Sequence, residues 1–418
     1  MANPGQNFPN TPGGHHRGGQ GKVLPPPLPP PESAAGAHGE SLSRGMHLLR
    51  LLLRCAECVA TDDLDGAADL LPEISELSSP FGTPPERVAA YFGHALQARV
   101  ISTCLPPPPR SIKTLAAGDQ TQKIWSALQC YNSLSPLIKF SHFTANQAIF
   151  EAVHGEDCVH VIDLDIMQGL QWPGLFHILS ASRSRKIRSV RITGFGSSLE
   201  SLEATGRRLA DFAASLGLPF DFTPVEGKVG TLTDFSPFAA RDFGEREATV
   251  VHCLQHCLYD VTGDDFATLR LLAVVRPKLV TIVEQDLNLR AGGAGNEFLG
   301  RFVEALHYYS AMFDALGEGL SEECEERHAV EQQVFGREIG NVIRRSVEAA
   351  TRVGRWAEEL GRLGFRGVSL GGSPAAQAGL LLGMMPWKGY TLVEENGWLK
   401  LGWKDLSLLT ASAWEPHD

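Results

Sequence analysis

The sequence predicts an α/β protein in which an all-helical amino-terminal cap precedes a doubly wound sheet that ends in an antiparallel hairpin. Up to residue 156, apolar side chains recur at steps of three and four, the pattern of amphipathic helices. From residue 157 onward, short apolar runs alternate with helical stretches, which is typical of a parallel sheet. After residue 365 the apolar runs follow one another closely, and Glu395-Asn396-Gly397 between two of them predicts a hairpin turn.

The beginning of the chain differs in composition from the rest. Residues 1–31 hold nine prolines and six glycines, so we expect a disordered tail over residues 1–40. Helical patterning begins at Ser41, and Thr61-Asp62-Asp63 can cap a second helix. A capping box, Thr83-Pro84-Pro85-Glu86, predicts the start of a third. Two further helices, at 120–133 and 136–154, complete the predicted cap over residues 41–156.

The remaining residues, 157–418, form the predicted α/β core. Its first strand is almost continuously apolar and ends in carboxylates, which suits a strand buried on both faces. Expected strands are 157–165, 187–195, 220–225, 248–254 and 279–284, followed by 365–370, 390–394, 398–403 and 406–414. Expected helices begin at Trp172 and span 199–216, 264–275, 296–316 and 341–360.

Composition and charge limit the possible functions. The chain has 43% hydrophobic and 20% charged residues, as soluble globular proteins do. The net charge of −11 argues against a surface devoted to nucleic acid, because phosphate binding needs a local excess of Lys and Arg. No apolar stretch approaches the length of a membrane span or a signal peptide. Eight cysteines without such a signal predict reduced thiols in an intracellular protein.

The order of elements matches the Rossmann-like outline of class I methyltransferases. In that fold the loop after the first strand contacts the cofactor, so this loop is the candidate cofactor site. Asp165 and Met167 stand where a D-x-G-x-G pattern would place its glycines, and the second strand ends without an acidic residue. We therefore expect no cofactor. The alternative, a small-molecule-binding or S-adenosylmethionine-dependent methyltransferase-like protein, stays open. Asp163 and Asp165 are interpreted as anchors of a helix start, with a catalytic carboxylate pair as the alternative.

A cluster of His and Cys residues and a run of Arg and Lys residues could each bind a ligand, but each can also be explained by its place in the fold. His252, Cys253, His256 and Cys257 have formally possible zinc spacing. However, His252 and Cys253 lie in or at the end of an apolar strand, where neighbouring side chains point to opposite faces, so we expect buried structural roles and no metal. No catalytic constellation emerges, which predicts that the chain is not an enzyme. The sharpest basic run is a possible DNA contact or, alternatively, a solvated helix end. It comprises Arg183, Arg185, Lys186, Arg188 and Arg191.

A leucine-rich stretch in the first helix contains the pattern L-x-x-L-L twice, one residue apart. Such a pattern is commonly part of a core, but these leucines surround the helix, and a second face needs a partner to cover it. The candidate partner-binding residues are Leu48, Leu49, Leu51, Leu52 and Leu53.

Several motifs, in order, resemble those of the plant GRAS transcription regulators. Val159-His160-Val161-Ile162-Asp163 is similar to the VHIID signature of that family, and Ser412-Ala413-Trp414 to its closing SAW motif. Leucine-rich regions flank the first motif at about 42–105 and 209–240, so the resemblance covers residues 41–418 as one GRAS domain. The sequence that follows the first motif resembles that of the SCARECROW and SCARECROW-like subgroup.

This resemblance implies a nuclear regulator of transcription in plant development that acts through protein–protein contacts. It implies a heterodimer with a SHORT-ROOT-type GRAS protein through the first leucine-rich region. It also implies recruitment by zinc-finger proteins of the INDETERMINATE-DOMAIN type, which would supply DNA specificity. Together with the acidic net charge, it favours indirect rather than direct DNA contact and no association with a membrane.

Overall fold

The fold is seen in a computed structural model, and the chain divides into two compact units, Met1–Ser43 and Arg44–Asp418. The described part of the first unit is the start of helix α1. The predicted cap, up to residue 156, and the predicted core, from residue 157, both lie in the second unit, apart from the first residues of α1. The structure describes residues 32–104, 117–181, 187–235, 238, 247–288, 297–344, 356–384 and 388–417.

Helices α1–α5 precede the sheet, and side-chain capping marks the starts of α2 and α3. Helix α1 starts at Glu32, upstream of the predicted start at Ser41. Asp63 caps α2, because its side chain accepts a hydrogen bond of 3.0 Å from the backbone N–H of Gly66. At α3, the Glu86 carboxylate accepts from the backbone N–H of Thr83 at 2.8 Å, which is half of the predicted capping box. The bounds are α1 Glu32–Ala60, α2 Leu64–Leu77, α3 Pro84–Cys104, α4 Ala117–Leu134 and α5 Leu137–Ala152.

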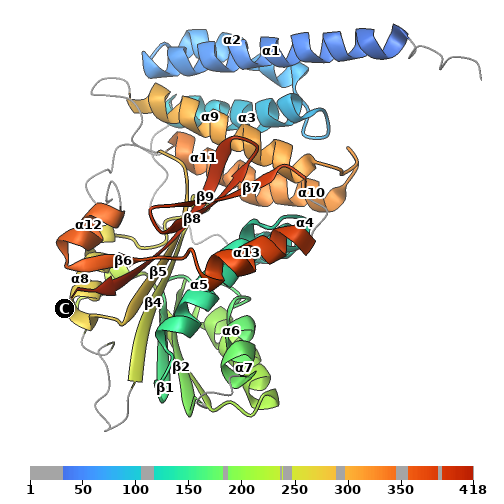
Figure 1. Ribbon diagram of the computed structural model, residues 1–418. Helices are drawn as coiled ribbons and strands as arrows, with labels where there is room; N and C mark the ends of the chain where they lie inside the picture. Colours follow the sequence, from blue (N-terminus) through green and yellow to red (C-terminus); the bar gives the residue numbers. More distant parts are fainter. Residues whose placement is uncertain are drawn as a thin grey trace, which may run out of the picture. The chain divides into compact units, whose positions relative to one another are not determined.

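The sheet has the strand order β3-β2-β1-β4-β5-β9-β8-β7, with β6 paired to β9 (Figure 1). Strands β1 to β5 pair in parallel, with β1 between β2 and β4, as a doubly wound fold requires. Strand β9 joins β5 in the antiparallel sense. This confirms the predicted fold class. The bounds are β1 Cys158–Asp163, β2 Ser189–Gly196, β3 Phe220–Glu226, β4 Glu247–Gln255, β5 Leu279–Gln285, β6 Phe365–Val368, β7 Tyr390–Glu395, β8 Trp398–Trp403 and β9 Leu406–Pro416.

Helices cover both faces of the parallel strands, because successive side chains of a strand point to opposite sides. Val159 and Val161 of β1 belong to a core shared with α5, α6 and α7, whereas Ile162 belongs to a second core shared with α8 and α12. Figure 1 shows α6 and α7 on one side of the sheet and α8 and α12 on the other. The bounds are α6 Trp172–Ala181, α7 Leu199–Ser215, α8 Asp265–Val275 and α12 Trp356–Arg362, with a short 3₁₀ turn, η1, at Val229–Thr231.

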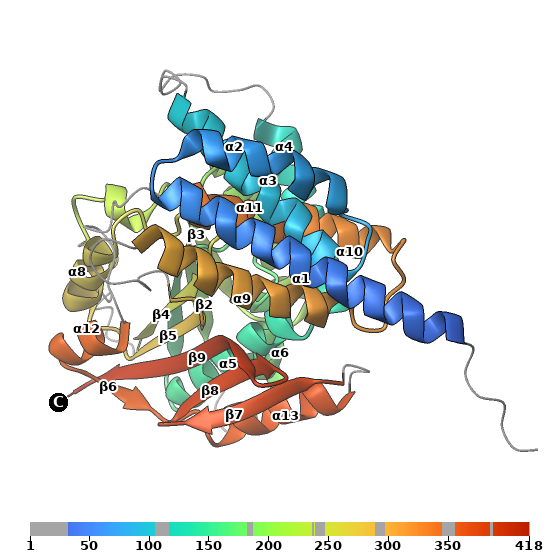
Figure 2. The same cartoon turned by 90° about the horizontal axis from the view of Figure 1, so that it is seen from above.

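The carboxyl-terminal half contributes further helices to the helical layer. Helices α9 and α11 pack beside α3 (Figure 2). The helix expected at 341–360 is described only at its ends, by α11 and α12, and α13 was not predicted. The hairpin turn between β7 and β8 has positive φ at Asn396 and Gly397, 56° and 83°, as a two-residue turn of this kind requires. The bounds are α9 Glu297–Gly317, α10 Glu325–Val330, the π-helical turn η3 Glu331–Phe335, α11 Gly336–Arg344 and α13 Ser373–Met384.

Candidate functional site

Asp163 ends the central strand β1 and connects it to the start of α6. Its Oδ2 atom accepts a hydrogen bond of 2.9 Å from Nε1 of Trp172, the first residue of α6. Its Oδ1 atom accepts from the backbone N–H of Asp165 at 3.1 Å. Burial raises the pKa of the Asp163 carboxyl to about 7. This geometry supports the interpretation of Asp163 as the anchor of a helix start.

Asp165 takes part in a separate network. Its Oδ2 atom accepts from the Tyr259 hydroxyl at 2.7 Å and from Nε2 of His256 at 3.2 Å. The backbone N–H of Leu258 donates to Nδ1 of the same imidazole, so Nε2 is the nitrogen that donates to Asp165. The two carboxylates therefore face different partners, and the alternative of a catalytic pair receives no support from their hydrogen bonds.

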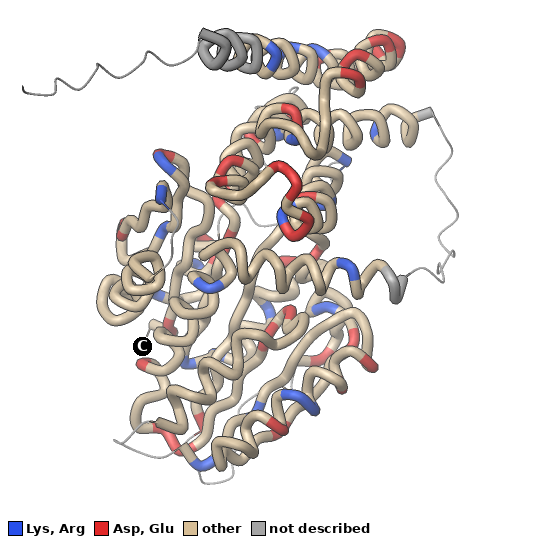
Figure 3. Tube along the Cα trace, turned by 90° about the vertical axis from the view of Figure 1, so that its right-hand side faces the viewer, with Lys and Arg blue, Asp and Glu red and all other residues tan. Residues whose placement is uncertain are grey.

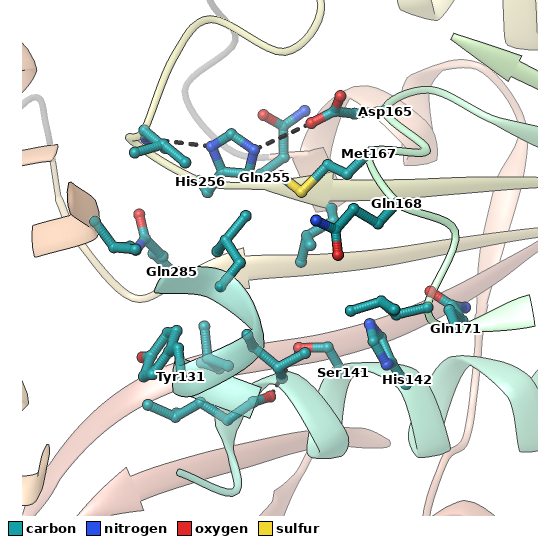
Figure 4. A pocket seen from close by; sticks show the side chains of 18 of the residues that line it. Tyr131, Ser141, His142, Asp165, Met167, Gln168, Gln171, Gln255, His256 and Gln285 are labelled. Carbon is teal, nitrogen blue, oxygen red and sulfur yellow. Dashed lines mark hydrogen bonds and ion pairs between the residues drawn. The ribbon is translucent and has the colours of Figure 1, made fainter. Parts of the chain in front are cut away.

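The loop that follows β1 has the backbone of a glycine-rich loop but not its open space. Met167 has a φ of 46°, a left-handed conformation that favours glycine. In dinucleotide-binding folds, a glycine in this loop lets the pyrophosphate approach the backbone. Here Met167 and Gln168 project into the space beside the strand ends (Figure 4). An S-adenosylmethionine site of the usual kind is therefore not favoured.

A pocket of about 130 Å³ lies between this loop, helices α4 and α5, and the ends of β4 and β5 (Figure 4). Side chains far apart in the sequence meet there, among them Tyr131, His142, Met167, Gln255 and Glu338. Burial lowers the pKa of His142 to about 4 and raises that of Glu338, which accepts hydrogen bonds from Gln285 and Tyr309. The helical side of this pocket is not predictable from the sequence, because its residues on α4 and α5 look like ordinary core positions.

The His/Cys cluster is occupied by structural contacts. Nδ1 of His252 lies 2.9 Å from the Thr281 hydroxyl, and its ring packs perpendicular to that of Trp172. The thiol of Cys253 accepts from the Gln255 amide at 3.1 Å. In the part of the chain that the structure describes, no three His, Cys, Asp or Glu side chains converge as metal ligands do.

The VHIID-like motif is strand β1, and its residues are all buried. Nε2 of His160 lies 2.8 Å from the Thr193 hydroxyl on the neighbouring strand β2. The side chains of Val159, Val161 and Ile162 pack on the two faces of the sheet. The motif therefore builds the core and places Asp163 at the strand end.

The SAW-like motif lies in β9, the strand that turns the sheet from parallel to antiparallel. Ser412, Ala413 and Trp414 pair with successive residues of β5. Nε1 of Trp414 donates to the Ser412 hydroxyl at 3.0 Å, and the indole packs against Trp398. The motif therefore positions the closing strand against the parallel sheet.

The basic run is only partly described. Arg183, Arg185 and Lys186 lie outside the described residues. Arg188 is exposed and directly precedes β2. Arg191 is buried, and its guanidinium donates to both carboxylate oxygens of Glu247 at 3.0 Å. That ion pair neutralises Arg191, which leaves it unsuited to hold a phosphate.

The leucines of α1 divide between the interior and the surface. Leu48, Leu51 and Leu52 are buried in the main core, whereas Leu49 is 37% exposed and Leu53 is half-buried. Of the five predicted contact leucines, only Leu49 and Leu53 can meet a partner without unpacking the helix.

The raised pKa of Asp163 leads to a pH-dependent prediction for Asp163→Asn. The folded state holds the proton of this carboxyl more tightly than the unfolded chain, whose value is near 3.8. The stabilisation from protonation is therefore fully present below the unfolded pKa and is lost as pH rises through 7. The variant cannot ionise there, so its unfolding free energy relative to the native chain should rise by up to about 1.4 kcal/mol per pH unit across this range.

Urea denaturation of both proteins at a series of pH values measures this difference. Asp69→Asn, at an exposed position of α2, is the control and should show no such trend. A difference that stays constant or falls with pH would contradict the assigned direction of the shift.

Comparisons with known proteins agree with the fold and the motifs. The model of the GRAS domain family matches residues 48–415. The chain is 65% identical over 375 residues to "Scarecrow-like protein 23" of Arabidopsis thaliana, covering 89% of this chain and 90% of that protein. It is 57% identical to "Protein SCARECROW" of Arabidopsis thaliana, covering 89% of this chain and 56% of the relative, so it spans about half of that protein.

A solved structure supports the same assignment. The "Crystal Structure of SCL7 in Oryza sativa" superposes with a TM-score of 0.72 at 32% sequence identity, covering 88% of this chain and 99% of the other. In the described residues, no helix has the length and apolar character that crossing a bilayer requires. From the family match, the relatives and the shared fold, the chain belongs to the GRAS family of plant developmental regulators, among its SCARECROW-like members.

Proposed function

We propose that this protein acts in the nucleus as a non-enzymatic regulator of transcription in plant development, through contacts with other proteins. Its first partner would be a SHORT-ROOT-type GRAS protein bound at α1, and a zinc-finger protein of the INDETERMINATE-DOMAIN type would bring the complex to DNA. The functional unit would be residues 41–418, with a cap over 41–156, a core over 157–418 and a tail over 1–40. Membership of the SCARECROW-like group supports this proposal.

The observation that carries the proposal is the outer face of α1. Met46 is 46% exposed and Leu49 is 37% exposed, and Leu53 continues the same face one turn later. Exposed apolar side chains at this spacing are typical of a helix that packs into a partner. The opposite face, with Leu48, Leu51 and Leu52, is already used by the core.

Charge favours indirect DNA contact. Lys and Arg lie interspersed with Asp and Glu along the described part of the chain (Figure 3). Arg191 of the basic run is paired with Glu247, and the whole chain carries a net charge of −11. Because DNA affinity depends on a local excess of cations, a separate DNA-binding protein better explains recruitment.

Leu49→Glu tests the α1 contact. A carboxylate at this exposed position should weaken capture of a SHORT-ROOT-type GRAS protein by about tenfold or more, because it would be buried without a partner. The measurement is co-purification and titration of the two purified proteins. Thermal unfolding should remain unchanged, since Leu49 is not part of the buried core.

Leu380→Glu is the matched control, because Leu380 is 62% exposed on α13. It should bind the partner as the native chain does. Equal binding by Leu49→Glu and the native chain would remove α1 from the proposed interface. Leu51→Glu is uninformative, since Leu51 lies in the core and a charge there would unfold the cap.

A further inference from the structure

The pocket between the cap helices and the sheet lies where doubly wound proteins bind ligands. Strand order reverses between β1 and β4, and Asp163 and Gln255, the last residues of these two strands, both line the pocket. Ligands of open α/β sheets bind outside the carboxyl ends of the strands at such a reversal. The position of the pocket is thus that of a binding site, although Met167 removes the close backbone approach that a nucleotide needs.

We propose that this pocket binds a compact, uncharged, mainly apolar small molecule that offers one hydrogen-bonding group to His142. The site goes beyond the proposed function and does not depend on the α1 contact. Its volume of about 130 Å³ is close to that of apolar protein cavities of about 150 Å³ that hold one benzene ring, and because the pocket is partly open to solvent, a second fused ring can extend toward its mouth.

The lining is mostly apolar. Side chains from α4 and α5 close one side, and the loop after β1 closes the other (Figure 4). Burying an apolar ring against such a surface is favourable, at about 25 cal/mol per Å² of apolar surface removed from water. The apolar residues of the lining include Leu128, Leu137, Ile138, Ile166, Leu254 and Met312.

Charge excludes an anion. The lining contains no Lys or Arg in the described chain. Both ring nitrogens of His256 are already engaged, by the backbone N–H of Leu258 and by Asp165, and burial lowers the pKa of His142 to about 4 and that of His252 to about 3. A phosphate or carboxylate would therefore lose its water without gaining a cation, and it would face Asp163 and Glu338.

The carboxylates that line the pocket are already engaged, which argues against a cationic ligand. Asp165 accepts from Tyr259 and His256, and Glu338 accepts from Gln285 and Tyr309. To pair with a cation, either carboxylate would have to give up these buried hydrogen bonds.

His142 and Gln168 can orient an uncharged ligand. Among the described residues, no hydrogen-bond partner is found for the half-buried His142 ring, which borders the pocket. A neutral imidazole can donate at one nitrogen and accept at the other. Gln168 faces the same space from the loop after β1 (Figure 4), and its side chain is held by Gln129 at 3.1 Å. A single hydroxyl or ring N–H on the ligand would match these groups.

Calorimetric titration of the full chain with naphthol, naphthoate and S-adenosylmethionine tests the site. Naphthol is a neutral two-ring molecule with one hydroxyl, and naphthoate places a carboxylate on the same rings. We expect saturable binding of naphthol with a rise in Tm, binding of naphthoate weaker by about tenfold or more, and no binding of S-adenosylmethionine. No saturable heat with naphthol at its solubility limit, or tighter binding of naphthoate, would overturn the proposal.

Substitutions place the binding. Ile138→Trp should fill the pocket and abolish the naphthol response, and Ser141→Leu offers a smaller obstruction if the first variant folds poorly. Ile101→Trp is the matched control, because Ile101 is 49% exposed on α3 outside the pocket. His142→Phe should weaken naphthol about fivefold but leave naphthalene binding unchanged. Naphthol binding that survives both obstructing variants in folded protein would place it elsewhere and refute the site.

Discussion

Glu331→Ala should lower the free energy of unfolding by about 3–5 kcal/mol, because it leaves two buried guanidinium groups without their counter-charge. The Glu331 carboxylate is completely buried and accepts from Nε of Arg87 at 2.9 Å and from Nη1 of Arg327 at 3.2 Å. Arg87 and Arg327 are 4% and 1% exposed, so water cannot replace the lost carboxylate. We expect this loss in urea denaturation followed by circular dichroism.

The control for this prediction removes the whole buried network. A triple variant with Arg87→Met, Arg327→Met and Glu331→Leu fills a similar volume with apolar atoms and should unfold much less easily than Glu331→Ala. The comparison separates the cost of an unpaired charge from the cost of lost packing. A loss below about 1 kcal/mol for Glu331→Ala would show that the arginines find other acceptors. Three are already in place, the carbonyls of Gly82, Phe313 and Glu322.

The buried network of Arg87, Arg327 and Glu331 could not be predicted from the sequence. Arg87 and Glu331 lie on α3 and on the π-helical turn η3, and 244 residues separate them. Either residue alone resembles a charged residue on the outer face of a helix. Only the packing of α3 against the carboxyl-terminal helices buries them together, and local patterns carry no information about that packing.

Elements with strong local signals were predictable. The caps at Asp63 and Glu86, the apolar run of β1 and the turn at Asn396-Gly397 lie where the sequence places them. Helix α13 was missed because Ser373–Met384 is rich in small residues and has no strong apolar face. Its helical state depends on packing against α5.

The candidate site was predicted in part. The hypothesis that Asp163 anchors a helix start follows from a carboxylate at a strand end shortly before Trp172, and the structure shows that bond. The pocket was not foreseen, since His142 and Tyr131 lie on helices whose role depends on tertiary contacts. The leucine pattern of α1 predicts one buried and one exposed face. It does not tell which leucine lies on which face, because that depends on the neighbouring helices.

Trp172→Ala should lower the unfolding free energy by about 3–5 kcal/mol, because it empties a large volume beside the central strand. The side chain of Trp172 is completely buried, and its ring packs perpendicular to that of His252. The same substitution removes the indole N–H that donates to Asp163. Because that hydrogen bond lowers the pKa of Asp163, its loss should raise this pKa further. The variant should therefore lose more stability at alkaline pH than at mildly acidic pH.

Trp172→Phe separates the two contributions. It keeps most of the buried volume but not the N–H, so we expect a loss of about 1–3 kcal/mol, the cost of an unsatisfied buried acceptor. In the background of Asp163→Asn, whose side chain does not ionise, the pH-dependent part of that loss should disappear. The coupling free energy from this double-mutant cycle, measured by urea denaturation, then gives the strength of the bond between β1 and α6. If Trp172→Phe costs as much with Asp163→Asn as without it, at every pH, then packing alone fixes the start of α6 and Asp163 is not its anchor.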